Sequence, residues 1–298
     1  MLNSQKNQEN SKYLIAFSAG RKLTYLRFKK AIKYFESDFK AAWLATKQDW
    51  LRAGFQPKVA KDLFNLKYMI NPEAEWIKIK QAGINFSTVT DQTYPDLLKH
   101  IHRPPWIIYH QGNLDCLNRP SLAIVGTRQS SIYGKKITAR LTAEIIQSGI
   151  TIVSGLAIGI DTIAQQTCWE NNQPTVAVLG MDLITQPKKF LLKKIIGAGG
   201  AIISHFPLFT PASKYTFPDR NRIIAGLTLG TLVIEAKARS GALITAYQAL
   251  DENREVMAVP GNIDQENSTG TNRLIQLGAK SIVSVQDVLE SLNLGQID

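Results

Sequence analysis

Apolar and polar residues follow two different patterns along the chain, and the pattern changes near residue 120. Between Leu23 and Gly83 apolar residues recur every three or four positions, as Ala31, Tyr34 and Phe35 do, which is typical of one face of an α-helix. Glycine and proline residues interrupt this pattern, so it predicts three or four short helices. We expect a small helical domain over residues 13–90, preceded by a polar, disordered tail at residues 1–12.

After the change, short apolar runs alternate with segments long enough for a helix. Runs that are apolar on both faces and separated by helices are typical of a parallel sheet covered on both sides. The sequence therefore predicts an α/β fold, with a doubly wound, mostly parallel, extended Rossmann-like sheet over residues 121–298 and a connector at residues 91–120. The predicted strands are 122–125, 151–153, 175–179, 201–204, 231–234, 255–259 and 281–283, with extended runs at 84–89 and 106–109 before them and a last helix at 285–292.

Charge adds a partner class to this picture because it is unevenly distributed. Of the net charge of +11, residues 1–115 carry +8, from 18 basic and 10 acidic residues, and residues 116–298 carry +3, from 17 basic and 14 acidic residues. Such a positive field attracts nucleic acid, since binding releases the counterions condensed on its phosphates. Lipid headgroups or simple solubility explain the charge as well, so charge alone leaves the partner open.

Several function classes are excluded by what the sequence lacks. No apolar run approaches the roughly 20 residues that span a bilayer, and residues 1–12 lack the apolar stretch of a secretory signal, so we expect a cytoplasmic protein without membrane contact. Cys116 and Cys168 are far apart and the four histidines are dispersed, which predicts neither a disulfide nor a metal site. Fingerprints of dinucleotide binding, the P-loop and the serine hydrolase elbow are missing. We expect no cofactor, no catalytic residue and no enzymatic reaction.

Glycines and polar residues gather where the predicted strands end. The first strand ends in Gly126, Thr127 and Arg128, and the second in Ser154 and Gly155. In open parallel sheets, ligands bind beyond the carboxyl ends of the strands. Glycine lets a backbone approach a ligand, helix N-termini offer N–H groups to phosphate, and the arginine fork suits it. Together these residues predict phosphate binding, although any single glycine is explained more simply by the packing of a tight turn.

Two further segments place basic residues beside aromatic rings. The segment from Phe217 to Arg222 holds two arginines just before an apolar helix, and Lys188 and Lys189 precede Phe190. Such a pairing grips a phosphate chain while a ring stacks on a base. Taken alone, each segment is explained better as a solvated helix surface, with a core phenylalanine in the case of Phe217. Two acidic residues at the strand ends, Asp161 and Glu235, are expected to cap the helices that start near Gly159 and Ser240.

Six segments, in order, resemble the successive motifs of the DprA/Smf family. Residues 94–98 and 105–112 are similar to the lead-in of that family, so the resemblance spans about residues 94–285. The six segments are Leu122 to Gly134, Ile152 to Asp161, Phe217 to Thr228, Leu232 to Ala246, Val256 to Gly261 and Gly270 to Ala279.

This resemblance implies a protein of natural transformation that binds single-stranded DNA in a basic pocket at the strand ends. It further implies a homodimer formed through the Rossmann-like domain, loading of the RecA recombinase while single-strand-binding protein is displaced, and a sterile-alpha-motif-like N-terminal domain. Arg128 would contact a phosphate, Arg220 and Arg222 would line the same pocket, and Phe217 would stack on a base. The full set of implied DNA-binding residues is Gly126, Thr127, Arg128, Ser154, Gly155, Lys188, Lys189, Phe217, Arg220, Asn221 and Arg222.

The sequence departs from the family pattern at three positions and leaves one alternative open. Gln165 stands where the family usually has histidine, Gln186 where it has tyrosine, and His205 where it has glutamate. Many members also carry a C-terminal winged-helix domain, which we do not expect here. The alternative is a nucleotide-binding or nucleotide-hydrolysing Rossmann-like enzyme or sensor, related to the nucleoside-phosphate hydrolases called LOG, with Glu235 as its candidate carboxylate. The sequence indicates neither the dimer surface nor the contacts with the recombinase.

Overall fold

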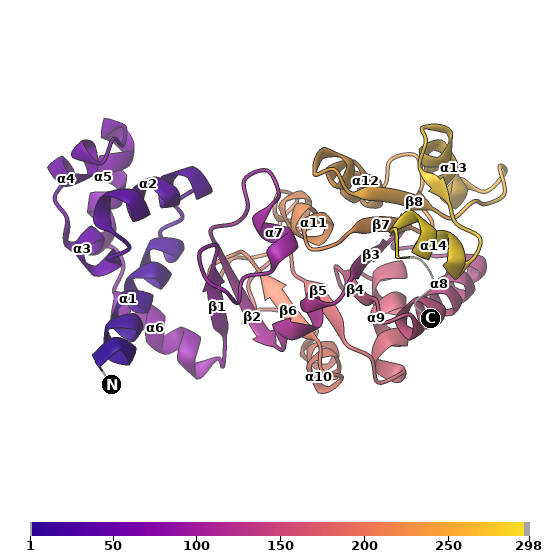
Figure 1. The fold of residues 1–298 in the computed structure, drawn as a ribbon, viewed down its shortest axis with the longest axis horizontal. Coiled ribbons are helices and arrows are strands. Elements are labelled where there is room, and N and C mark those ends of the chain that lie inside the picture. Colours follow the sequence, from indigo (N-terminus) through magenta and orange to yellow (C-terminus); the bar gives the residue numbers. More distant parts are fainter. Residues whose placement is uncertain (1, 295–298) are drawn as a thin grey trace.

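The structure is a computed structural model that describes residues 2–294. Helices gather at the N-terminal end of the molecule, and a broad sheet with helices on both faces forms the rest of it (Figure 1). This arrangement confirms the predicted α/β fold with a preceding helical domain. None of the described helices is both long enough and apolar enough to cross a bilayer.

Within residues 2–294 a single sheet holds nine strands, in the order β1-β2-β6-β5-β4-β3-β7-β8-β9. In this spatial order, the strands from β6 through β3 to β9 run parallel to one another. At the other edge β2 pairs antiparallel with β6, and β1 pairs antiparallel with β2. The chain builds outward from β3 to β6 and then returns to the other side of β3 with β7, which makes the junction of β3 and β7 the topological switch point. The strands are β1 (Asn85–Thr88), β2 (Ile107–Gly112), β3 (Ser121–Val125), β4 (Thr151–Ser154), β5 (Thr175–Val178), β6 (Ala201–Ser204), β7 (Gly230–Val233), β8 (Glu255–Ala258) and β9 (Lys280–Ser281).

Helices cover both faces of this sheet, as the doubly wound pattern predicts. The α-helices of the helical domain are α1 (Leu2–Ala19), α2 (Tyr25–Phe35), α3 (Phe39–Leu44), α4 (Lys47–Arg52), α5 (Pro57–Asn65) and α6 (Pro72–Gln81). Those that follow in the sheet domain are α7 (Asp96–Lys99), α8 (Ile132–Gln147), α9 (Ile160–Glu170), α10 (Lys189–Gly197), α11 (Thr216–Gly226), α12 (Gly241–Asp251), α13 (Thr269–Gln276) and α14 (Val285–Ser291), and short 3-10 turns lie at Leu66–Tyr68, Leu114–Asn118 and Glu266–Ser268.

Strand β3 shows why two helical layers are needed. Successive side chains of a strand point to opposite faces. Leu122 and Ile124 pack in a core with residues of α8, α9 and α14, while Ala123 and Val125 pack in a second core with residues of α11, α12 and α13. All four side chains are buried. A central strand that is apolar on both faces therefore holds the two layers together.

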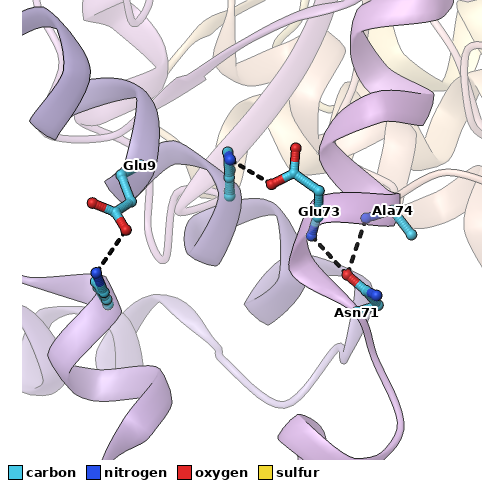
Figure 2. Close-up of polar contacts among 6 residues, drawn as sticks. Glu9, Asn71, Glu73 and Ala74 are labelled. Carbon is cyan, nitrogen blue, oxygen red and sulfur yellow. Dashed lines mark hydrogen bonds and ion pairs between the residues drawn. The ribbon is translucent and has the colours of Figure 1, made fainter.

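The first residues of the chain are helical, so the predicted disordered tail is wrong for the described residues from 2 to 12. Helix α1 extends from Leu2 to Ala19, and near its C-terminal end Phe17 packs in the aromatic core of the helical domain. Polar contacts also tie its exposed part to its neighbours: Lys12 pairs with Glu73, and Glu9 lies 2.6 Å from the Lys40 ammonium (Figure 2). Residue 1 and residues 295–298 lie outside the described residues.

The helical domain contains more helices than its apolar pattern predicts. Five α-helices, α2 to α6, lie between residues 25 and 81, where we expected three or four. Several start at a polar cap that a periodicity argument overlooks, such as Thr46, which forms a capping box with Asp49. Asn71 caps α6 by accepting hydrogen bonds from the backbone N–H groups of Glu73 and Ala74 (Figure 2).

Residues 91–120 are part of the sheet domain and not a connector packed against it. Within this range β2 pairs with β6, with Tyr109 opposite Ser204, and β1 from the expected helical domain pairs with β2. The pairing partner of β2 lies about 90 residues further along the chain, so local patterns give no sign of it. Trp106 joins the two domains, since its ring stacks on Phe28 at 4.6 Å and its Nε1 donates to the Leu23 carbonyl at 2.8 Å.

Candidate nucleic-acid interface

A cavity of about 530 Å³ opens at the topological switch point, where β3 and β7 end. We call it the strand-end pocket. Its walls are the loops after β3 and β7 together with α11 and α12, which is where open parallel sheets bind their ligands. Positive charge predominates in it, because its lining within the described part of the chain holds one acidic residue, Asp161, and five basic ones. The basic residues are Arg128, Lys214, Arg220, Lys237 and Arg239.

Arg128 presents its charge to solvent on a fixed loop. The backbone N–H of Thr127 donates to the Glu235 carbonyl at 2.8 Å, and the Thr127 carbonyl accepts from the Ile160 N–H at 3.3 Å, which anchors the loop between β7 and α9. The Arg128 guanidinium lies 5.4 Å from the centre of the Phe217 ring. No described residue accepts a hydrogen bond from it, so its donors remain available to an anion.

Arg220 lies beneath the pocket and has a different role. Its side chain is only 5% exposed, and its Nη1 donates to the carbonyls of Gly155 at 2.5 Å and Val178 at 2.7 Å. The buried carboxylate of Asp161 is nearby: burial raises the pKa of Asp161, and the Arg220 charge opposes that rise. Arg220 therefore holds the ends of β4 and β5 together and adds positive charge to the pocket floor.

The strand-end glycines serve packing, so the expectation that they bring the backbone close to a ligand is wrong for Gly155. A Cβ on Gly155 would lie 2.1 Å from Nη1 of Arg220, and one on Gly126 would lie 2.5 Å from the Ile160 side chain. Gly126 and Thr127 line the strand-end pocket, whereas Gly155 does not. Ser154 is fully buried and its hydroxyl donates to the Ile124 carbonyl at 2.6 Å, so it supports the strand ends from below.

The two lysines after β5, Lys188 and Lys189, have different surroundings although they are adjacent in sequence. Lys188 lines a neighbouring cavity of about 530 Å³ that shares Arg128 with the strand-end pocket, and its ammonium donates to the Leu156 carbonyl at 2.6 Å. Burial lowers the pKa of Lys188, while Asp161 acts to raise it. Lys189 begins α10, is exposed, and lines neither cavity. Of this pair, Lys188 is therefore the one that extends the positive surface beyond Arg128.

Arg222 does not share a pocket with Arg220, and the prediction that it does is wrong. Positions two apart on an α-helix point about 200° away from each other. Arg222 accordingly turns to the opposite face of α11, where its Nη1 donates to the carbonyls of Arg103 at 2.7 Å and His102 at 3.2 Å. Asn221 does line the strand-end pocket, and its Oδ1 accepts from Nε of Arg220 at 2.9 Å.

Three basic residues of the strand-end pocket were not predicted from the sequence. Lys237 and Arg239 follow β7 directly, so the strand-end rule that identified Arg128 would also have identified them. Lys237 lies 2.7 Å from the Glu266 carboxylate, which reduces its free charge, whereas Arg239 is exposed. Lys214 comes from the segment before α11, and no local signal places it at this pocket.

Glu235 was expected to cap α12, and the structure shows that it does not. Its carboxylate is bound in the loop before α8 instead. Its Oε1 accepts from the Ser131 hydroxyl at 2.5 Å and its Oε2 from the Ser131 N–H at 3.0 Å. Ser131 is the N-cap of α8, so Glu235 fixes the start of that helix. Asp161 lies in the first turn of α9 but does not form the expected cap, since its Oδ2 accepts from the Gly155 N–H at 3.1 Å, before the helix begins. With both oxygens of Glu235 occupied, no observation favours the nucleotide-hydrolase alternative.

Comparison with known proteins identifies the family of the chain. A family model described as DNA recombination-mediator protein A matches residues 85–293. The chain belongs to this family. The resemblance to DprA/Smf proteins is thereby confirmed, and the matched residues include every loop that lines the strand-end pocket.

Members of the family with curated sequences and solved structures are similar over much of the chain. Protein Smf from Synechocystis sp. is 39% identical over 80% of this chain but only 62% of its own length, so the chain spans less than two thirds of that relative. DNA processing protein DprA from Bacillus subtilis is 39% identical over 72% of this chain and 73% of its own length. The X-ray structure of DprA from Streptococcus pneumoniae superposes with a TM-score of 0.78 at 33% identity, covering 95% of this chain and 97% of the other.

Proposed function

We propose that the strand-end pocket binds the sugar-phosphate backbone of single-stranded DNA. The observation that carries this proposal is the exposed Arg128 guanidinium beside the Phe217 ring, in a pocket where four further basic residues gather. An arginine fork with unoccupied donors suits phosphate. A ring next to it offers a stacking surface for a base, and bases are free to stack on protein only in unpaired strands.

A related protein supports the choice of ligand. DNA processing protein A from Helicobacter pylori, whose structure concerns its single-stranded DNA binding mode, superposes with a TM-score of 0.62 at 27% identity and covers 72% of this chain. The strand-end pocket gives this chain the means for the same ligand, since its positive charge and its ring lie at one rim of the sheet.

We also include in the proposal the finer roles that the family resemblance implies. These are a part in natural transformation, loading of the RecA recombinase on the bound strand, a homodimer and a cytoplasmic location. The protein acts in this proposal as a binding protein that catalyses no reaction. Its function is then to hold a single strand in a form that a recombinase can accept.

A salt titration tests DNA binding directly. Affinity for oligo-dT is expected to fall as salt rises, with a slope of log K against log salt of about −0.7 for each phosphate contacted. Binding to a duplex of the same length is expected to be weaker, because paired bases cannot stack on Phe217. Fluorescence anisotropy with labelled strands measures both. No binding at low salt, or equal affinity for duplex and single strand, would contradict the proposal.

Phe217→Leu tests the stacking part of the proposal. This change keeps an apolar side chain of similar size in the half-buried site and removes the aromatic face. We expect a loss of about 1–3 kcal/mol in binding free energy for oligo-dT, the contribution of one stacked base, with an unchanged salt slope because no phosphate contact is removed. A matched control is Phe190→Leu, since Phe190 is 69% exposed and lines neither the strand-end pocket nor the cavity of Lys188. Equal affinities for the two variants would argue against stacking on Phe217.

A further inference from the structure

A second cavity, of about 590 Å³, lies where the helical domain meets the sheet domain. We call it the junction pocket. The helical domain contributes the end of α1 and the start of α2, and the sheet domain contributes the segment before β2, the segment after β6 and one face of α11. The sequence did not predict it, because its walls come from parts of the chain that are far apart in sequence, from Ser18 to Arg222.

Among the described residues, three arginines line the junction pocket, against a single carboxylate from Asp219. Arg222 donates through Nη1 to two backbone carbonyls, and Arg21 donates through Nη2 to the Thr210 hydroxyl. A guanidinium has five N–H donors, so these bonds leave most of the donors of Arg21 and Arg222 unused. Arg103 is exposed and donates no hydrogen bond from its side chain to a described residue. The cavity therefore offers several charged donors for an anion.

Two of these arginines have an unusual backbone conformation. Arg21 has φ of +52° and Arg103 has φ of +58°, in the left-handed region that glycine adopts more readily than any other residue. Side chains at such positions cost conformational free energy, and such strain is concentrated at functional sites. Both strained arginines line the same cavity. Their placement is explained if their charges are needed there.

An unpaired histidine nitrogen is a further observation at the same cavity. His205 lines the junction pocket, and its buried Nδ1 has no hydrogen-bond partner among the described residues. Buried polar atoms are rarely left unsatisfied in folded proteins. This nitrogen is itself covered, so the ring contributes to the cavity through its other atoms.

Helix α11 forms a wall of both pockets. Phe217 and Arg220 line the strand-end pocket, while Arg222 lines the junction pocket from the opposite face of the same helix and Thr216 lines it at the start of the helix. The two pockets are separated by the width of one helix, about 10–12 Å with side chains. A short stretch of nucleotides is long enough to pass around it. At the start of α11, Tyr215 is 74% exposed and the Lys214 ammonium lies 5.1 Å from the centre of its ring. A cation and a ring therefore stand where a strand would pass from one pocket to the other.

We propose that a single strand bound in the strand-end pocket continues around the start of α11 into the junction pocket, where Arg21, Arg103 and Arg222 bind its phosphates. This inference rests on the proposed function, and it gives the helical domain a direct part in binding the strand. The aromatic rings of Tyr25, Trp106 and Phe206 in the same cavity supply apolar surface for the sugars and bases.

The test is a length series of oligo-dT, from about 4 to about 16 nucleotides, with the double variant Arg21→Gln and Arg103→Gln. Both side chains are exposed, so the variant is expected to fold. Short strands fill only the strand-end pocket and are expected to bind the variant and the unaltered protein equally. Long strands are expected to bind the variant about ten-fold more weakly. The salt slope for long strands is expected to become shallower by about 0.7 for each phosphate that the variant no longer binds.

The matched control is Arg52→Gln, which removes the same charge from an exposed position of the helical domain outside the junction pocket. Equal affinity of the double variant and the control at every length would overturn the inference. A loss that is the same for short and long strands would also overturn it, because it would reflect long-range charge and not a second binding region. If the unaltered protein bound no strand of any length, the proposed function itself would fail, and the inference about the junction pocket would fail with it.

A free nucleotide is the other source of phosphate for this cavity, and deoxythymidine monophosphate distinguishes the two sources. If the junction pocket binds a strand that continues from the strand-end pocket, this nucleotide is expected to bind weakly and without dependence on Arg21 and Arg103. Strong binding of the nucleotide that the double variant abolishes, together with an unchanged length series, would identify a separate nucleotide site. It would overturn the inference that one strand continues into the junction pocket.

Discussion

Replacing Arg220 with methionine is expected to lower the free energy of unfolding by about 2–6 kcal/mol, since each of two buried carbonyls left without a donor costs about 1–3 kcal/mol. Methionine fills a similar volume but donates nothing. The carbonyls of Gly155 and Val178 lose their donor, and the buried carboxylate of Asp161 loses the positive charge that faces it. Chemical denaturation followed by circular dichroism measures this loss.

The pH dependence of that loss identifies its cause. Burial raises the pKa of Asp161 in the folded protein, and removing Arg220 raises it further. A carboxyl with a raised folded-state pKa destabilises the protein as pH rises through that pKa, and this penalty vanishes below the unfolded value of about 3.9. The stability difference between the variant and the unaltered protein is therefore expected to shrink as pH falls from 7 towards 4. A difference that is constant over this range would assign the loss to the two carbonyls alone.

Arg239→Met is the control for this experiment, because Arg239 lines the same pocket but is exposed. Exposed substitutions of this kind usually change stability by no more than about 0.5 kcal/mol. If Arg220→Met were as mild as Arg239→Met, the guanidinium of Arg220 would not be the tie between β4 and β5 that the structure indicates.

The sheet could be predicted from local sequence because its central strands are buried on both faces. Strands such as Ser121–Val125 and Ala201–Ser204 are continuous apolar runs, and a run of this kind identifies itself without knowledge of its partner. The strand Ile107–Gly112 was predicted only as an extended run, since its place in the sheet between β1 and β6 depends on pairing with β6 far along the chain. Residues 91–120 were therefore assigned to a connector.

The candidate site was predictable as far as a single rule reaches. The carboxyl ends of parallel strands share one rim, which is enough to place Arg128 correctly and would have placed Arg239 as well. The reason for Gly155 was out of reach, because the side chain that fills its missing Cβ belongs to Arg220, 65 residues later. The error for Arg222 was avoidable, since helical periodicity alone separates it from Arg220. The junction pocket required the packing of the two domains to be known.

Arg128→Ala is expected to weaken binding of single-stranded DNA by about 10- to 100-fold, the equivalent of one charge-assisted hydrogen bond of about 1.5–3 kcal/mol. The loss is expected to be the same for oligo-dT and for mixed sequences, because a phosphate contact carries no base information. The salt slope is expected to become shallower by about 0.7. Anisotropy titrations at several salt concentrations measure all three quantities.

Arg128 and Arg220 thus separate binding from stability within one pocket. The Arg128 side chain is exposed and gives no hydrogen bond to a described residue, so Arg128→Ala is expected to leave the free energy of unfolding within about 0.5 kcal/mol of the unaltered protein. Arg52→Ala, at an exposed position of the helical domain, controls for the loss of one positive charge and is expected to leave affinity nearly unchanged. Equal affinity of the Arg128 and Arg52 variants would place the phosphate contact elsewhere on the rim, because a binding arginine must lose affinity without losing stability.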